Sequence, residues 1–246
     1  MNKLEQIKKE LRRSANSIQA KNLQRFFKTG KGEYGFGDVF IGMKVPDIRR
    51  VVKKHKDTES PIIEKLIKSE IHEERLCGLL ILVLRYELGD EFQQEKMANI
   101  YLKHKRHINN WDLIDLTAHK ILGHYLIDRP KEILYKLSRS ESVWDRRIAI
   151  LATFYFIKQN KYTNSLKLAK ILIEDRHDLI HKAVGWMLRE VGNRSPETEE
   201  IFLKKYYKKM PRTMLRYAIE KFNYDERKKY LGMRGLGLKS LGLMSR

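Results

Sequence analysis

Apolar residues recur at spacings of three and four along most of the chain, which is the pattern of amphipathic helices. The pattern is clearest in four segments, at residues 77–86, 113–126, 147–157 and 181–191. Sustained alternation of apolar and polar residues is absent, and no Asn-Gly or Asp-Gly pair marks a tight hairpin. The sequence therefore predicts an all-α protein.

Prolines indicate where several of these helices begin. Ser60-Pro61 and Ser195-Pro196 each predict an N-cap followed by proline at the first helical position. Pro130 and Pro211 are expected to open helices in the same way.

The helices recur at a nearly constant interval. A charged residue precedes or opens an apolar helical segment at steps of 37, 35, 35 and 34 residues, at Arg75, Asp112, Arg147, Lys182 and Arg216. This period predicts an α-solenoid of HEAT-like helix pairs, because each pair must stack on its neighbours to bury its apolar face. We expect one curved domain over residues 1–230 whose concave face carries a row of basic side chains. Residues 231–246 predict a Gly-rich, basic and poorly ordered tail.

The charge balance narrows the class of partner. The chain has 51 Lys and Arg against 31 Asp and Glu, a formal net charge of +20. Such a surplus suits a polyanion, most simply nucleic acid, although composition alone also fits a soluble basic protein or a membrane-surface binder. The hydrophobic content of 42% excludes a wholly disordered chain, and no apolar run reaches membrane-spanning length.

Cysteine usage and the start of the chain predict the compartment. Cys77 is the only cysteine, so neither an internal disulfide nor a cysteine-based zinc site is available, and it sits in an apolar run where thiols are usually unreactive. The first residues are charged and helix-periodic with no signal-peptide core. We expect a cytoplasmic monomer, associated with the nucleoid when bound to DNA, that has no membrane partner.

Two short motifs resemble ligand sites but lack the surroundings that those sites need. Residues 30–35 match G-x-G-x-x-G, yet a helical pattern and not a strand precedes them, so we expect a loop between helices. His177 and His181 resemble the zincin H-E-x-x-H with Asp178 in place of Glu, and no third metal ligand is indicated. We expect no dinucleotide or metal site at either place.

The three tryptophans of the chain each have a charged residue at helical spacing. Trp111 and Asp115 are four residues apart, Trp144 precedes Arg147 by three, and Trp186 is followed by Arg189. Tryptophans of a solenoid also serve as core residues. The alternative is a cluster of indoles, a carboxylate and guanidinium groups contributed by successive repeats.

At these residues the sequence resembles a known family. N-W-D-L-I-D (110–115), W-D-R-R-I-A-I-L (144–151), K-A-V-G-W-M-L-R-E (182–190) and F-I-G-M-K-V-P-D-I-R (40–49) are similar to segments of AlkD-like DNA alkylation repair proteins. The resemblance covers roughly residues 20–225. It implies a HEAT-like-repeat DNA glycosylase that removes positively charged N-alkylated purines, of the 3-methyladenine and 7-methylguanine type, from duplex DNA without a base-flipping pocket.

The resemblance also implies residue roles. The catalytic carboxylate falls on Asp115, the two indoles that contact the deoxyribose fall on Trp111 and Trp186, and the arginine that contacts the backbone falls on Arg147. We expect phosphate or backbone contacts from Arg189, Lys182, Arg146, Lys44 and Arg216. No cofactor or metal is implied.

Two other functions fit the same scaffold. The first is a non-catalytic HEAT-repeat binder of damaged or branched DNA, because the family also contains members that lack glycosylase activity. The second is a HEAT-type protein–protein scaffold, which the net charge disfavours.

Overall fold

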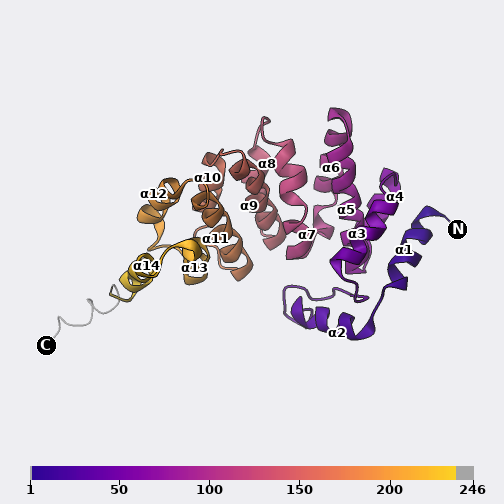
Figure 1. Ribbon diagram of the computed structural model, residues 1–246, viewed down its shortest axis with the longest axis horizontal. Coiled ribbons are helices and arrows are strands. Elements are labelled where there is room, and N and C mark those ends of the chain that lie inside the picture. The colour runs from indigo at the N-terminus through magenta and orange to yellow at the C-terminus, as the bar shows by residue number, and fades with distance from the viewer. Residues whose placement is uncertain (1, 237–246) are drawn as a thin grey trace. The chain divides into compact units, whose positions relative to one another are not determined.

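The structure, a computed structural model, describes residues 2–236, and within that range every regular element is a helix (Figure 1). The one exception in this range is an isolated bridge between Val39 and Ile71. The all-α prediction is confirmed. Contacts divide the chain into two compact units, Met1–Arg129 and Pro130–Arg246, here called unit 1 and unit 2. One continuous domain over residues 1–230 stays a prediction.

Unit 1 is built around one long buried helix, α5. In chain order its elements are α1 (Lys3–Arg13), α2 (Ser17–Phe26), α3 (Val45–Lys54), α4 (Ser60–Ile67), α5 (His72–Leu88), α6 (Glu91–Lys103), η1 (Lys105–His107), α7 (Trp111–Asp115) and η2 (His119–Gly123). Helix α5 packs against α1, α3, α4 and α6. Its segment 77–83 is buried on all sides, which suits a helix that is apolar around its whole circumference.

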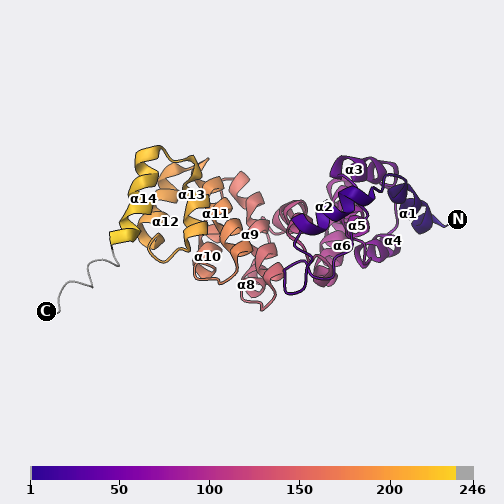
Figure 2. The same cartoon turned by 90° about the horizontal axis from the view of Figure 1, so that it is seen from below.

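Unit 2 is built around α11 in the same manner. Its elements are α8 (Glu132–Leu137), α9 (Val143–Lys158), α10 (Thr163–Ile171), α11 (Asp178–Gly192), α12 (Pro196–Tyr206), α13 (Arg212–Ala218), η3 (Ile219–Lys221) and α14 (Tyr224–Leu236). Helices α9, α11 and α13 lie side by side (Figure 2). A Cβ on Gly185 would come within 2.4 Å of the Met214 carbonyl oxygen, so the α11–α13 contact requires a glycine there.

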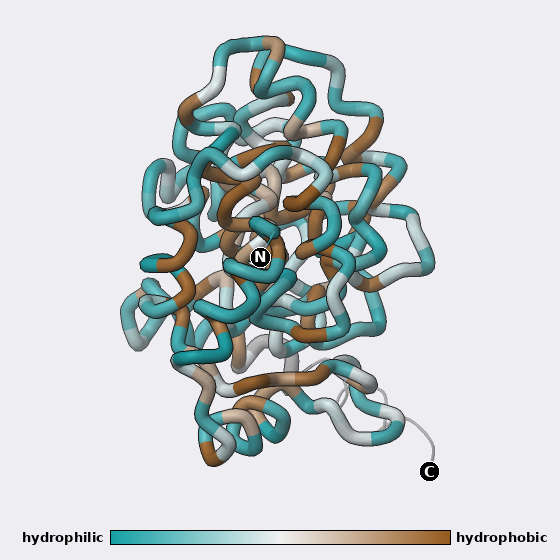
Figure 3. The backbone as a smooth tube through the Cα atoms, turned by 90° about the vertical axis from the view of Figure 1, so that its right-hand side faces the viewer, coloured by the Kyte–Doolittle hydropathy of each residue, from teal (hydrophilic) through white to brown (hydrophobic). Residues whose placement is uncertain are grey.

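Three of the four predicted apolar segments lie inside single helices, α5, α9 and α11. Short apolar stretches alternate with polar ones along the backbone, and α1, beside the N label, is mostly hydrophilic (Figure 3). The segment 113–126 differs from the prediction, because α7 ends at Asp115 and the π-helix η2 follows. Between α7 and η2, the Thr117 hydroxyl donates to the Leu113 carbonyl and so competes with the backbone hydrogen bonds of the helix.

The predicted helix starts are close to the observed ones. Ser195 is the N-cap of α12 and Pro196 its first residue, as predicted. Helix α4 begins one residue early, at Ser60. Pro211 is the N-cap of α13, and Pro130 lies just before the N-cap of α8.

The predicted tail begins within a helix, because α14 extends to Leu236. The poorly ordered tail stays a prediction. Residues 237–246 lie outside the described residues. Between residues 2 and 236, no helix combines the length and the apolar character needed to cross a bilayer.

Candidate functional site

The Gly-rich segment between α2 and α3 is a loop, as predicted, and it is fastened to the start of α5. The Val39 carbonyl accepts from the His72 amide at 2.8 Å. The buried Glu73 carboxylate accepts from three consecutive backbone amides, those of Ile41, Gly42 and Met43, at 2.8–3.2 Å. Gly42 has φ +85, and a Cβ there would meet the Asn16 carbonyl oxygen at 2.0 Å, so only glycine fits.

A cluster of buried charges joins this loop to α5 and to the start of α7. Asp38 of the loop, 7% exposed, pairs with His72 Nδ1 at 3.1 Å and with the Arg75 guanidinium. His72 Nε2 lies 2.8 Å from Asp112 Oδ2. The Asn110 amide nitrogen donates to Asp38 Oδ2 at 3.0 Å. The loop, α5 and α7 therefore share one hydrogen-bonded network.

The network favours the charged forms of His72 and Asp38. Burial alone would lower the pKa of His72, but the Asp112 and Asp38 carboxylates outweigh it and raise that pKa to about 9. Burial would likewise raise the pKa of Asp38, but hydrogen bonds from His72 and Asn110 and the charge of Arg75 lower it overall. Both ring nitrogens of His72 face carboxylate oxygens, so both donate hydrogen bonds.

Helix α7 carries the two residues at the centre of the sequence prediction. Asn110 is its N-cap, and its side-chain oxygen accepts from the Trp111 amide at 2.9 Å. The helix spans Trp111–Asp115, so the indole and the carboxylate are its first and last residues. The Trp111 ring stacks on Phe27 at 5.1 Å and meets the exposed Phe26 edge-on at 5.8 Å.

Trp111 and Asp115 line one cavity of about 480 Å³ within unit 1. Its other walls come from α2, from the loop and from the starts of α3 and α5, and include Phe27, Phe40 and Lys44. The lining is mostly aromatic and aliphatic with Asp115 and Asp112 among it. An indole face and a carboxylate in an apolar hollow favour a cationic partner over a neutral one.

The other two predicted catalytic residues belong to unit 2. Arg147 of α9 is 5% exposed and donates to the Leu179 carbonyl at 2.6 Å. Trp186 of α11 is half-buried, packs near Phe154, and donates from Nε1 to Glu190 at 3.2 Å. Their roles toward DNA stay predictions.

The residues predicted to bind the DNA backbone differ in their present partners. Lys182 pairs with Asp178 at 2.7 Å and Arg146 with Asp175 at 2.6 Å. Arg189 pairs with Glu220. The side chains of Lys44, at the N-cap of α3, and Arg216, on α13, are exposed.

Three of the five charged residues that were predicted to form a row along one face are buried, and the basic concave face itself stays a prediction. Arg75, Asp112 and Arg147 are buried and hydrogen-bonded inside the protein. Arg75 donates to carbonyls of the preceding loop, whereas Asp112 pairs with His72 of α5 and Arg147 donates to the Leu179 carbonyl of α11. The period identified five recurring helices, but each helix begins one to four residues before its charged residue, and the period did not indicate the direction in which these side chains point.

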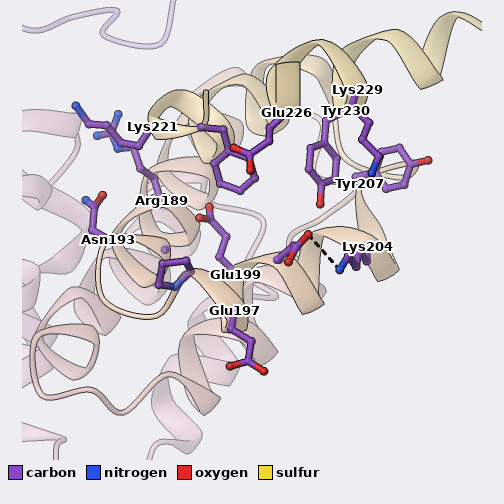
Figure 4. Close-up of a pocket in the computed structure, with 14 residues that line it drawn as sticks. Arg189, Asn193, Glu197, Glu199, Lys204, Tyr207, Lys221, Glu226, Lys229 and Tyr230 are labelled. Carbon is purple, nitrogen blue, oxygen red and sulfur yellow. Dashed lines mark ion pairs between the residues drawn. The ribbon is translucent and has the colours of Figure 1, made fainter. Parts of the chain in front are cut away.

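A pocket of about 610 Å³ lies in unit 2 beside Arg189 (Figure 4). The Glu199 side chain of α12 points into it, between Arg189 and Glu226, and is 2% exposed. Its Oε1 atom is buried without a hydrogen-bond partner. Burial raises the pKa of Glu199 to about 8 despite the opposing charge of Arg189.

The motifs set aside in the sequence have structural roles. His177 caps α11 by accepting from the Leu179 amide at 3.1 Å, and His181 bonds to the Asp175 carbonyl. The described residues contain no cluster of three or more His, Cys, Asp or Glu that could hold a metal ion.

Cys77 is buried in α5, and burial raises the pKa of its thiol to about 12, so the reactive thiolate form is disfavoured.

Sequence reasoning missed the residues that support α7. Phe26 and Phe27 are adjacent in a helical pattern that gave no sign of contact with Trp111. Asp38 lies 72 residues before Asn110, its partner. The one local signal was Asn110 itself, because asparagine directly before a helical segment is a preferred N-cap.

Comparisons with known proteins agree with this architecture. A solved structure, described as a predicted DNA alkylation repair enzyme from Enterococcus faecalis, has the same fold, with a TM-score of 0.67 and 15% sequence identity. The match covers 86% of this chain and 98% of that chain. No curated protein matches the sequence.

A family model described as DNA alkylation repair enzyme matches residues 7–222. That match covers most of the 246-residue chain, and it agrees with the resemblance carried by the four segments around residues 40–49, 110–115, 144–151 and 182–190. The protein belongs to the DNA alkylation repair enzyme family.

Proposed function

We propose that the protein is a DNA glycosylase that excises positively charged N-alkylated purines from duplex DNA by hydrolysis of the N-glycosidic bond. Membership of the family supports a role in DNA repair, with DNA as the partner. The formal net charge of +20 suits a polyanionic substrate. One observation carries the finer proposal, namely that Trp111 and Asp115 line the same apolar cavity.

The chemistry follows from the charge of the lesion. Alkylation at N3 or N7 makes the purine cationic, so it is already a good leaving group. As the bond breaks, C1′ of the sugar becomes oxocarbenium-like, and a carboxylate stabilises this positive charge electrostatically. Asp115 supplies that carboxylate and orients the attacking water, whose proton it accepts. The water oxygen bonds to C1′ while the purine leaves with the bonding electron pair.

Trp111 contributes selectivity. The face of an indole attracts a cation by about 0.5–2 kcal/mol, and a neutral base receives no such stabilisation. Phe27, stacked behind Trp111, holds the ring in place. Normal nucleotides are therefore disfavoured at the reacting position, and the proposed attack from the sugar side requires no enclosed pocket for the base.

Trp186 and Arg147 extend the proposal to unit 2. Their roles, contact with the lesion-bearing deoxyribose and with the DNA backbone, rest on the family resemblance. Each is tested by its own substitution, Trp186→Phe and Arg147→Lys. The change to phenylalanine keeps an aromatic face, and the change to lysine keeps the charge without the planar fork of donors.

The decisive experiment measures base release. Wild-type protein incubated with N-methylated duplex DNA should liberate free methylated purine and leave abasic sites. Asp115→Asn should lower the single-turnover excision rate by about 10²–10⁴-fold and leave DNA affinity unchanged. Asp57→Asn, an exposed aspartate of the same unit, is the matched control and should excise normally.

Three results would reject parts of this proposal. If the wild type releases no base but still binds alkylated DNA, the protein is a non-catalytic binder. Equal excision by Asp115→Asn and wild type would remove Asp115 from the carboxylate role. A DNA affinity that barely changes between low and high salt would exclude phosphate contacts as its main source.

A further inference from the structure

Asp38 belongs to the Gly-rich loop, yet its carboxylate meets residues from two other parts of unit 1. It pairs with His72 and Arg75 of α5 and accepts from Asn110, the residue before α7. All four side chains belong to residues that are 7% exposed or less. Each charge in this group therefore has an opposite charge or a hydrogen-bond donor as its neighbour, which a buried charge requires.

Asn110 transmits this attachment to α7. Its amide nitrogen donates to Asp38 Oδ2 at 3.0 Å, and its amide oxygen accepts from the Trp111 backbone at 2.9 Å. One side chain thus joins the loop carboxylate to the first peptide of the helix that carries Trp111 and Asp115. On the opposite side of His72, Asp112 of the same helix bonds to the ring.

A second path runs through aromatic rings. Phe40 of the loop stacks on the His72 ring at 4.4 Å. Phe27 stacks on Phe40 at 5.0 Å and on Trp111 at 5.1 Å. The Trp111 indole is therefore held by a stack of rings that ends on the same histidine as the hydrogen bonds.

Helix α7 depends on such support because it is short. Five residues form barely more than one turn, and a helix of that length has no stability of its own in water. Its orientation must come from contacts outside the helix. A small misplacement of a catalytic group lowers a rate by as much as about 10²-fold, so this orientation has a catalytic consequence.

We propose that Asp38, His72 and Asn110 are positioning residues, which hold the start of α7 so that Trp111 and Asp115 face the cavity. The inference rests on the proposed function for its catalytic consequence, but the positioning itself is a property of unit 1. It gives the Gly-rich loop a role, because the loop supplies the carboxylate on which the network is centred.

The positioning is tested by fluorine NMR of protein labelled with 5-fluorotryptophan. The chain has three tryptophans, and only Trp111 lies in unit 1. Asp38→Asn and Asn110→Ser should shift or broaden the Trp111 signal and leave those of Trp144 and Trp186 unchanged. Serine is a good N-cap but is too short to reach Asp38, so this variant separates tethering from capping. Asp57→Asn is the control.

Single-turnover excision tests the consequence. Both variants should lose roughly 10–100-fold in rate at saturating enzyme while their affinity for DNA stays within twofold, a split that mere loss of stability does not produce. A folded variant with an unmoved Trp111 signal would overturn the positioning. A moved signal with an unchanged rate would overturn the catalytic consequence. Absence of excision in the wild type would reject the proposed function instead, and the fluorine signals would still decide the positioning.

Discussion

The buried carboxylates of unit 1 and unit 2 have different neighbours. In unit 1, Asp38 is surrounded by His72, Arg75 and Asn110, and Glu74, which is fully buried, pairs with Lys8 and Arg12 of α1. In unit 2, Glu199 is 2% exposed and its Oε1 atom has no partner. The pKa of Asp38 is lowered, whereas burial raises the pKa of Glu199 to about 8.

The difference shows two ways of burying an acid. A carboxylate that is matched by donors stays charged and fixes the geometry of the elements it joins, here the loop, α5 and α7. A carboxylate without donors takes up a proton instead. A Cβ on Gly192 would come within 1.7 Å of the Glu199 Oε2 atom, so the glycine leaves room for this carboxylate.

Removing the centre of the paired network should have the largest effect on stability. Asp38→Ala leaves the buried Arg75 guanidinium without its carboxylate partner and leaves His72 with Asp112 alone. We expect the free energy of unfolding to fall by about 3–5 kcal/mol, as for other buried ion pairs that lose one partner. Denaturant unfolding followed by circular dichroism measures this. Asp57→Ala is the exposed control. A loss below about 1 kcal/mol for Asp38→Ala would show that the interactions of Asp38 stabilise the protein no more than an exposed ion pair does.

The pH dependence of the free energy of unfolding isolates the contribution of His72 from those of the other residues in the network. Its pKa in the folded protein is about 9, above the ordinary value of 6.5, so its contribution is complete below pH 6.5 and is lost as the pH rises through 9. We expect a loss of about 2–3 kcal/mol over that range. Unfolding curves between pH 6 and pH 10 measure it. His72→Gln should be less stable at pH 6 and flatter across this window; an equally steep His72→Gln profile would assign the loss to another group.

The fold and half of the candidate site could be predicted from the sequence. Apolar spacing of three and four fixed the helices α5, α9 and α11, and the same spacing placed Trp111 and Asp115 on one helix. Both inferences depend on residues within one turn of each other, where the geometry of the α-helix determines which side chains are neighbours.

The support of the site could not be predicted, because it depends on contacts between distant residues. The run His72–Arg75 has the composition of an exposed first turn, yet each of its members is buried. Asp38 gave no signal, since its partners lie 34, 37 and 72 residues further along the chain. Arg147 likewise could not be distinguished from an exposed arginine by spacing alone.

The substitution Glu199→Gln tests whether the buried carboxylate of unit 2 destabilises the protein at high pH. The folded-state pKa of about 8 exceeds the ordinary 4.5, so the wild type loses stability as the pH rises from 4.5 through 8. The neutral amide avoids this loss. At pH 8 we expect Glu199→Gln to be more stable than the wild type by about 1–2 kcal/mol, a limited gain because the amide still lacks partners. Thermal unfolding at pH 4 and pH 8 measures it. Glu197→Gln, an exposed neighbour, is the control, and a destabilised Glu199→Gln would show that the carboxylate is ionised and paired.

The smallest expected effect is on the reactivity of Cys77, which reports on unit 1 alone. This thiol is the only one in the chain, is fully buried in α5, and has its pKa raised to about 12 by burial, so a disulfide reagent reacts only when unit 1 opens. Asp38→Asn should speed labelling about tenfold or more, which corresponds to about 1.4 kcal/mol in the opening equilibrium. Glu199→Gln should leave the labelling rate within about twofold of wild type, because its effect is confined to unit 2. A tenfold change in the Glu199 variant would mean that the two units open together, and that the stability of Glu199 and of the Asp38 network cannot be assigned to separate units.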